Sequence, residues 1–328
     1  MNDLYPLKFR PVFKEKIWGG NKIKTVFGMD YAPLSNCGEA WVLSGYGDEI
    51  SVVNNGFLAE NQLDELIEVY MGDLVGEAVY ELYGNKFPLL VKILNSSDWL
   101  SIQVHPDDDL AESRHNDLGK TEMWYVAQAD PGAKLISGFN RDMDADSYLS
   151  YLGNGTIKEI MNYEKVKKGD VFFIPAGRVH AIGPGLLIFE IQQTSDLTYR
   201  IYDFDRKDKE GNPRELHTEL ALDALDFTRS EQYKTDYQPD FNKTIPLVKS
   251  TYFNTGLIHF GTPVVKDYSG LDSFVILQCA EGKCMIEYAD GDETLKAGEV
   301  ILIPATMDRI RIVPLQETKL LEVYYPQN

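Results

Sequence analysis

The chain has 328 residues, of which 44% are hydrophobic, 12% aromatic and 25% charged. This composition is that of a globular protein with a substantial core, and the length predicts two domains. The formal net charge of −19, from 51 acidic and 32 basic residues, disfavours nucleic acid and anionic membranes as partners, because both require a basic surface. A phosphorylated small molecule stays possible, provided that its site contains its own cations.

The three cysteines, Cys37, Cys279 and Cys284, are odd in number and lack the spacing of a disulfide framework or a cysteine metal site. The first residues lack the basic stretch and apolar run of an export signal, and no later segment approaches about 18 consecutive apolar residues. We therefore expect a cytoplasmic protein without a membrane span. Its oligomeric state is left open.

In chain order, the first clear element is a helix that follows Asn61, a plausible cap residue. Leu63, Leu66, Ile67 and Tyr70 recur at helical spacing, so this face is expected to pack on the core. Weaker helical patterns cover residues 144–163 and 214–227, and we expect structural roles for both.

Short strands dominate the rest of the prediction, and their turns are rich in Gly, Pro, Asp and Asn. Closely spaced strands with little helix between them favour an antiparallel sandwich or barrel over a parallel sheet with crossover helices. We therefore predict a mainly β fold. The clearest strands are expected at residues 88–94, 100–105, 122–127, 171–174, 186–192 and 197–204.

A polar, aperiodic stretch at residues 230–240, which contains Pro239, suits a connection between domains. We place the boundary there, giving domains at residues 1–235 and 236–328. An internal repeat supports two similar domains, because the sequence KGDVFFIPA at residues 168–176 recurs as AGEVILIPA at residues 297–305. His180 follows the first copy and Arg309 takes its place after the second, so chemistry is expected in the first domain only.

Polar side chains capable of binding a metal lie on predicted strands of the first domain. The two-residue period of a strand puts Ser101, Gln103 and His105 on one face, opposite apolar neighbours. The same period puts Lys120 and Glu122 together on the next strand.

Adding His180, at the end of a third strand, gives two imidazoles, a carboxylate and an amide: His105, His180, Glu122 and Gln103. This donor set suits a divalent cation with an open coordination position. Zinc is our first choice, ahead of iron or manganese. For the other histidines we expect solvation at His115, packing or capping at His217, and a place in the second domain for His259.

Several segments together resemble the type I mannose-6-phosphate isomerases in their short bacterial form. They are residues 17–20 (IWGG), 87–105, 120–122 (KTE), 175–181 (PAGRVHA) and 192–200 (QQTSDLTYR). The resemblance implies tandem cupin, or jelly-roll, barrels with a small helical insertion. It also implies a zinc ion held by Gln103, His105, Glu122 and His180, and a catalytic Arg200. The additional helical domain of longer family members is not expected in a chain of this length.

The reaction that the resemblance implies, mannose 6-phosphate to fructose 6-phosphate, moves a proton between carbons 1 and 2 through an enediol. A base must move this proton, and Lys120 and Glu190 are the two candidates. Arg200 offers a planar donor fork for phosphate or for the developing enediolate oxygen. Ser101 and Lys92 are candidates for further phosphate contacts.

Two other functions stay open at this point. Two histidines and a glutamate also form the ligand set of non-haem iron oxygenases, although an extra amide ligand argues against oxygen chemistry. The alternative to both enzymes is a sugar-phosphate-binding protein without turnover. Lys120, Arg200 and the complete ligand set favour the isomerase.

Overall fold

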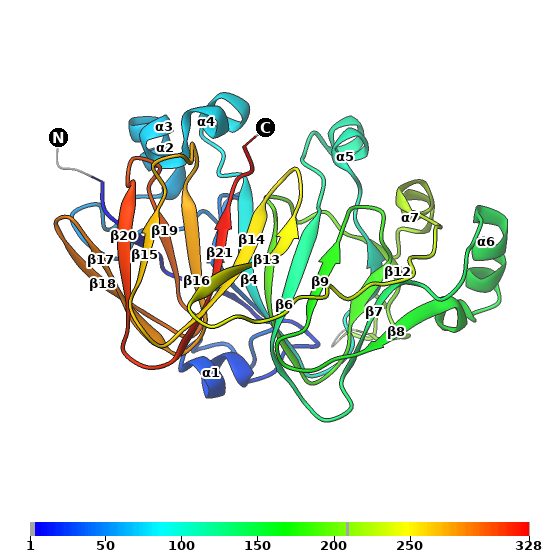
Figure 1. Cartoon of the computed structure of the whole chain (residues 1–328). Coiled ribbons are helices and arrows are strands. Elements are labelled where there is room, and N and C mark those ends of the chain that lie inside the picture. Colours follow the sequence, from blue (N-terminus) through cyan, green and yellow to red (C-terminus); the bar gives the residue numbers. More distant parts are fainter. Residues whose placement is uncertain (1–3, 208–209, 328) are drawn as a thin grey trace. The chain divides into compact units, whose positions relative to one another are not determined.

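The computed structural model describes residues 4–207 and 210–327, and strands form most of its regular structure (Figure 1). The predicted mainly β fold is confirmed. By compactness the chain groups into unit 1, residues 1–12, 41–92 and 236–328, and unit 2, residues 13–40 and 93–235. The division into consecutive domains at residue 235 stays a prediction. No helix among the described residues is long and apolar enough to cross a membrane.

Unit 2 contains two antiparallel sheets. One has the strand order β12-β5-β10-β7-β8, and the other includes the order β4-β11-β6-β9. The strands are β4 (Leu89–Ser96, which begins in unit 1), β5 (Ile102–Val104), β6 (Glu122–Ala129), β7 (Lys134–Phe139), β8 (Met161–Lys165), β9 (Val171–Ile174), β10 (His180–Ile182), β11 (Leu186–Gln193) and β12 (Tyr199–Tyr202). The helices are α1 (Lys22–Phe27), α5 (Asp108–His115), α6 (Ala145–Gly153), the 3-10 helix η1 (Ile157–Ile160) and α7 (Thr218–Ala224).

Alternation along the strands gives the first of these sheets an apolar face and a mixed face. Ile102 and Val104 point outward into a cluster with residues of α6, η1 and α7, which cover this side of the sheet (Figure 1). On the inner face, Ile182 packs with Trp124 and Phe172 of the opposing sheet. The interior of unit 2 is therefore apolar over part of its length, and the polar strand positions described below lie beyond this apolar part.

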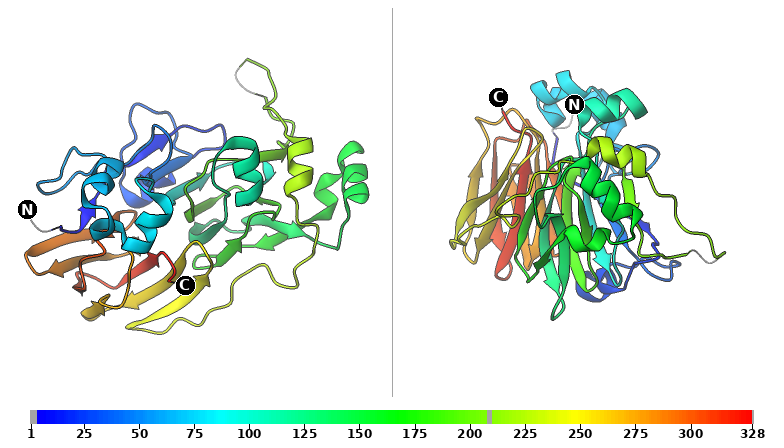
Figure 2. Two further views of the ribbon diagram at one scale, coloured as in Figure 1. Left: turned by 90° about the horizontal axis from the view of Figure 1, so that it is seen from above. Right: turned by 90° about the vertical axis from the view of Figure 1, so that its right-hand side faces the viewer.

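Unit 1 contains a second pair of antiparallel sheets, with helices α2, α3 and α4 gathered at one end of the strands in Figure 1 and in the right-hand view of Figure 2. Phe274, Ala305 and Thr306, at the ends of strands, donate backbone hydrogen bonds to carbonyls of α3, which closes that end. The elements are β1 (Leu7–Lys8), α2 (Leu63–Tyr70), α3 (Gly72–Val75), α4 (Glu77–Tyr83), β13 (Lys243–Lys249), β14 (Asn254–Phe260), β15 (Val264–Asp267), β16 (Val275–Glu281), β17 (Lys283–Tyr288), β18 (Gly291–Lys296), β19 (Val300–Ile303), β20 (Arg309–Pro314) and β21 (Thr318–Tyr324). The chain also crosses from one unit to the other within strands β2 (Val12–Lys14) and β3 (Glu39–Leu43).

The internal repeat forms the same local structure in each unit. Gly169 and Gly298 both adopt positive φ, 86° and 89°, which a glycine tolerates without strain. Each donates its N–H to a neighbouring strand, Gly169 to Val126 and Gly298 to Cys279, at 2.8 and 2.9 Å. The following strands, β9 and β19, start two residues later. Equivalent positions in the two units can therefore be identified from strand register as well as from sequence.

Three helix predictions need correction at their ends. Helix α2 is capped by Gln62 and Glu65, whereas the Asn61 side chain donates to the Leu58 carbonyl. The pattern at residues 144–163 contains α6, η1 and the first part of β8, because Gly155, at φ 70°, ends the helical run. The pattern at 214–227 contains the shorter α7, since the preceding residues extend away to contact β12 and the turn that follows it.

Gly138 in β7 is a place where the fold requires glycine. Its φ is +72°, and a Cβ there would overlap the ring of Tyr233, whose hydroxyl donates to the Phe139 carbonyl at 2.9 Å. We expect Gly138→Ala to lower the free energy of unfolding by about 2–4 kcal/mol, from backbone strain plus overpacking. Urea unfolding measures the difference. Gly132→Ala is the control, because Gly132 has φ +82° with nothing within 4 Å; an equal loss in both variants would contradict the overpacking argument.

Candidate metal centre and active site

Strand pairing places three of the predicted site residues in one row across a sheet. Gln103 of β5 lies opposite His180 of β10 on one side and opposite Arg200 of β12 on the other. Directly opposed residues of antiparallel strands share a face. Because Ile102 and Val104 point outward, this row points inward, toward the opposing sheet that carries Glu122.

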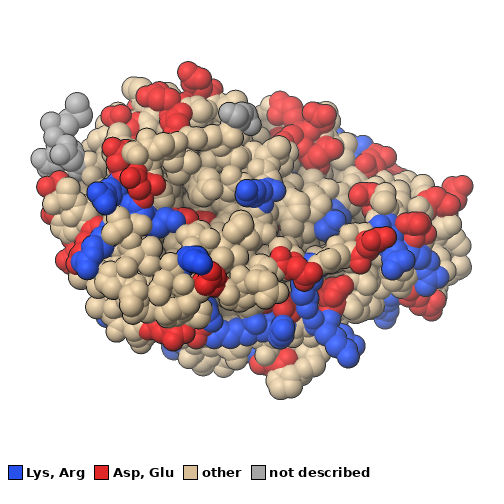
Figure 3. All heavy atoms as spheres, viewed as in Figure 1, with Lys and Arg blue, Asp and Glu red and all other residues tan. Residues whose placement is uncertain are grey.

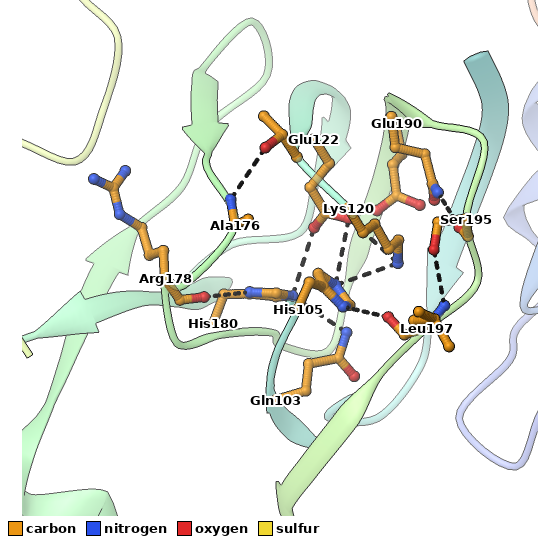
Figure 4. Close-up of polar contacts among 12 residues, drawn as sticks. Gln103, His105, Lys120, Glu122, Ala176, Arg178, His180, Glu190, Ser195 and Leu197 are labelled. Atoms are coloured by element: carbon orange, nitrogen blue, oxygen red, sulfur yellow. Dashed lines mark hydrogen bonds and ion pairs between the residues drawn. The ribbon is translucent and has the colours of Figure 1, made fainter. Parts of the chain in front are cut away.

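His105, Glu122 and His180 converge in the interior of unit 2, as Figure 4 shows. One possible ligand atom from each lies within 4.8 Å of the others, and each residue is only 1% exposed. The two Glu122 oxygens lie 3.5 Å from His105 Nε2 and 3.5 Å from His180 Nε2, respectively. The structure thus brings together the three ionisable members of the predicted ligand set.

Backbone carbonyls fix both imidazoles with Nε2 toward the centre. His105 Nδ1 lies 2.7 Å from the Leu197 carbonyl and His180 Nδ1 lies 2.9 Å from the Arg178 carbonyl. A carbonyl only accepts, so both Nδ1 atoms carry a proton, and in a neutral ring Nε2 then keeps a lone pair. Burial lowers the pKa of His180 to about 4, which keeps this ring neutral. Two lone pairs and a carboxylate facing one another fit a divalent cation, and carbonyl-held imidazoles are the usual orientation of metal ligands.

Gln103 completes the set at its edge. Its amide nitrogen lies 3.2 Å from His180 Nε2, and its oxygen accepts a hydrogen bond from the Ser101 hydroxyl at 3.0 Å. The hydroxyl of Ser101 can equally accept from an amide nitrogen, so rotation of the amide by half a turn would present its oxygen to a cation without losing this contact. Ser101 therefore orients Gln103 in the structure.

Lys120 lies beside the three converging residues. Its ammonium is 3.2 Å from His105 Nε2 and 3.4 Å from a Glu122 oxygen, and the residue is 4% exposed. A positive charge thus already lies among the atoms expected to ligate a cation. This contact supports both the predicted closeness of Lys120 and Glu122 and the preference of the group for positive charge.

Glu190 lies on the same inner face, because β11 pairs with β6 so that Glu190 is opposite Trp124. One carboxylate oxygen accepts a hydrogen bond from the Trp124 indole at 2.9 Å, and the residue is 4% exposed. The second predicted base is therefore buried and held in place by an aromatic ring.

Arg200 is half-buried, and one guanidinium nitrogen donates to the Glu215 carbonyl at 2.8 Å. Burial lowers the pKa of Arg200, and the charges of Arg214 and Arg206 act in the same direction. A guanidinium keeps its charge despite such shifts. Arg206 and Arg214 are themselves paired with the buried Asp203 carboxylate at the end of β12, so the phosphate contact predicted for Arg200 stays a prediction.

Lys92 differs from the other candidates. It belongs to unit 1, whereas the converging residues belong to unit 2, and its ammonium lies 4.7 Å from the centre of the Trp41 ring. Its predicted phosphate contact stays a prediction, and the contact with Trp41 does not add to it.

The acidic residues 107–109, which follow β5, form the start of helix α5. Asp107 caps this helix by accepting from the Leu110 N–H at 2.9 Å. Figure 3 shows acidic side chains gathered over α5. His115, at the end of the helix, is exposed but its Nε2 lies 2.8 Å from the Tyr199 hydroxyl. No pattern of apolar residues marks this helix, which explains why the sequence analysis missed it.

The equivalent positions of unit 1 hold different side chains. Glu122 and Val275 each lie opposite the last residue of the repeated strand. Arg309 starts β20 where His180 starts β10. A valine and an arginine have no lone pair to offer a cation. Among the described residues, His105, Glu122 and His180 form the one group of this composition.

Fold and site together define a metal-binding β-barrel protein of the cupin class, with two imidazoles and one carboxylate converging in one barrel. The comparisons agree. The family model for the catalytic domain of type I phosphomannose isomerase matches residues 6–155. Mannose-6-phosphate isomerase ManA of Bacillus subtilis is 35% identical over 311 residues, 94% of this chain and 95% of the relative. The chain belongs to the type I phosphomannose isomerase family.

Two further comparisons support this assignment. Mannose-6-phosphate isomerase of Streptococcus mutans serotype c is 43% identical over 224 residues, 67% of each chain. The crystal structure of the mannose 6-phosphate isomerase from Bacillus subtilis superposes with a TM-score of 0.87 at 32% identity, covering 97% of this chain and 99% of that one. The predicted fold of cupin barrels with a small helical insertion is therefore confirmed.

Proposed function

We propose that this enzyme interconverts mannose 6-phosphate and fructose 6-phosphate, with a zinc ion held by Gln103, His105, Glu122 and His180. The convergence of three buried ligand atoms within 4.8 Å carries the proposal, and family membership gives the reaction. Family membership also favours the isomerase over the two functions that the sequence left open, an iron oxygenase and a binding protein without turnover.

Zinc is proposed over iron and manganese because the donors are mainly imidazole nitrogen with one carboxylate. When bound, a divalent cation supplies Lewis-acid polarisation of the two neighbouring sugar oxygens. The reducing cytoplasm is the proposed location, supported by three buried cysteines that form no disulfide.

The protein's own residues would move the proton and stabilise the charge that develops. Lys120 or Glu190 would take the proton from one sugar carbon and return it to the next, since both are buried beside the converging residues. Arg200 would donate hydrogen bonds to the enediolate oxygen or to the phosphate. Ser101 would orient Gln103, as its hydrogen bond already does, and could contact the phosphate from the same strand.

Removal and return of the metal test the proposed reaction. The conversion of mannose 6-phosphate is followed by NMR with the protein as purified, after chelation, and after stoichiometric Zn²⁺, Mn²⁺ or Fe²⁺ is added back. We expect activity to disappear on chelation, because the ligand group then has no Lewis acid, and to return most fully with Zn²⁺. No conversion by the zinc-loaded protein would contradict the function. Better recovery with another ion would contradict the choice of metal alone.

Two matched variants separate the candidate bases. Lys120→Met removes the ammonium with little change of volume, and Glu190→Gln keeps an oxygen for the Trp124 indole while it removes the charge. Loss of the true base is expected to lower kcat by about 10²–10⁴-fold at unchanged zinc content. Incorporation of solvent deuterium into the product measures proton transfer directly. Small effects in both variants would show that neither residue is the base.

A further inference from the structure

We propose that His217 positions Arg200 for catalysis by pairing with its backbone, while the neighbouring Glu215 carbonyl holds its guanidinium. The inference rests on the proposed role of Arg200 in the isomerase reaction. It arises from contacts between β12 and the segment that leads into α7, a segment that the sequence predicted only to pack or to cap a helix.

Strand β12 is at the edge of its sheet, with β5 as its one neighbour in the strand order. At Arg200 both backbone groups point away from β5: the Arg200 N–H donates to His217 Nδ1 at 3.0 Å, and the Arg200 carbonyl accepts from the His217 N–H at 2.7 Å. The histidine thus pairs with this residue as the next strand would, but with a side-chain nitrogen as the acceptor.

This pairing has a consequence for the site. The N–H and the carbonyl of Arg200 both bond to His217 and not to β5. Arg200 and Gln103 are therefore a non-hydrogen-bonded pair, the kind of antiparallel pair in which the side chains lie closer. In such a pair the Cα atoms are about 4.5 Å apart. His217 therefore helps to set how near Arg200 lies to Gln103 and to the converging residues beyond it.

The segment that leads into α7 also holds the guanidinium end of the Arg200 side chain. One guanidinium nitrogen of Arg200 donates to the Glu215 carbonyl at 2.8 Å, whereas Nε is buried without a hydrogen-bond partner among the described residues. Two anchor points, one at the backbone and one at the guanidinium, restrict the arginine to few conformations. A donor that is already oriented loses little entropy when it meets a substrate oxygen.

Helix α7 fixes the segment itself. His217 occupies the cap position of α7, and its carbonyl accepts from the Ala221 N–H at 2.8 Å, but its side chain makes no capping bond. The helix packs through Ala221, Leu220 and Ala224 into the apolar cluster outside β5 and β12. The imidazole is therefore available to accept the hydrogen bond from the Arg200 N–H.

Since Nδ1 of His217 accepts, this ring must be neutral with its proton on Nε2. Burial and the Arg200 charge lower the pKa of His217, in agreement.

The test uses three variants of the full-length, zinc-loaded protein, each alone and combined with Arg200→Ala. His217→Leu removes the acceptor, and His217→Asn keeps one, because the Asn Oδ1 lies where the imidazole Nδ1 was. Glu322→Gln changes a buried carboxylate of unit 1 and touches neither α7 nor the pairing. We expect His217→Leu to lower kcat/KM about ten- to a hundredfold, His217→Asn to restore most of it, and Glu322→Gln to lower only the melting temperature.

If His217 acts through Arg200, His217→Leu should change kcat/KM by less than about twofold when Arg200 is already alanine. Losses that multiply, an inactive His217→Asn, or an equal kcat/KM loss in Glu322→Gln would overturn the inference. Hydrogen exchange of the Arg200 amide gives a readout that needs no turnover: it should be faster in His217→Leu than in His217→Asn. Equal exchange would overturn the pairing even if the wild type were inactive, whereas an inactive wild type with this difference would overturn the proposed function alone.

Discussion

Glu122→Gln is expected to lower kcat/KM for mannose 6-phosphate by at least about 10³-fold, since loss of Lewis-acid stabilisation is worth several kcal/mol. Glu122 is the one carboxylate of the ligand set, and its two oxygens face His105 and His180. The amide keeps its shape and removes its charge at a site only 1% exposed. Elemental analysis of the purified variant should show a zinc content well below one per chain.

Glu322→Gln is a matched control for this variant. Glu322 is also buried, and its carboxylate contacts Lys266 and Tyr268 in unit 1, away from the ligand group. Its replacement should lower the free energy of unfolding, because the partly buried Lys266 ammonium loses its charged partner, but it should leave the zinc content unchanged. Full zinc occupancy and activity in Glu122→Gln would refute the assigned ligand set.

Arg200→Ala is expected to lower kcat/KM by about 10²–10³-fold, the usual effect of removing one preorganised donor. Zinc content should stay at the wild-type level, since Arg200 is beyond Gln103 in the row and is not a ligand. The split between the parameters identifies its partner: a raised KM indicates phosphate binding, and a lowered kcat indicates stabilisation of the enediolate.

The control for Arg200→Ala is Arg141→Ala, which removes an exposed guanidinium whose hydrogen bonds, within the described part of the chain, go to Asn140 and the Glu159 carbonyl. Wild-type kinetics are expected for this variant. If Arg200→Ala kept near-wild-type kcat/KM, the arginine would have to be assigned a structural role.

The polar faces of the strands were the predictable part of the site. A period of two was enough to group Gln103 with His105 and Lys120 with Glu122, and the structure places these four close to His180. Their roles as ligands, bases and phosphate contacts stay proposals. Lys92 was a candidate for a phosphate contact apart from this grouping, and its contact with Trp41 could not be read from periodicity.

The contacts that orient the site were beyond the sequence analysis for a physical reason. The Leu197 and Arg178 carbonyls fix the two imidazoles, and the Glu215 carbonyl holds Arg200. Every residue has a carbonyl, so its side-chain identity gives no signal of such a role. His217 could have been noticed as the one histidine shortly after Arg200, but only strand pairing shows that its Nδ1 faces the Arg200 amide.

The pairing of strand β1 has a consequence for how the protein folds during its synthesis. Leu7 and Lys8 pair with Leu302 and Ile301 of β19, so this segment bonds to one that is synthesised much later. Translation at roughly 5–20 residues per second separates the two by tens of seconds. During that delay the Leu7 side chain, which is fully buried in the folded protein, has no partner in β19, and added protease should cleave pulse-labelled nascent chains near residue 7 until β19 has emerged.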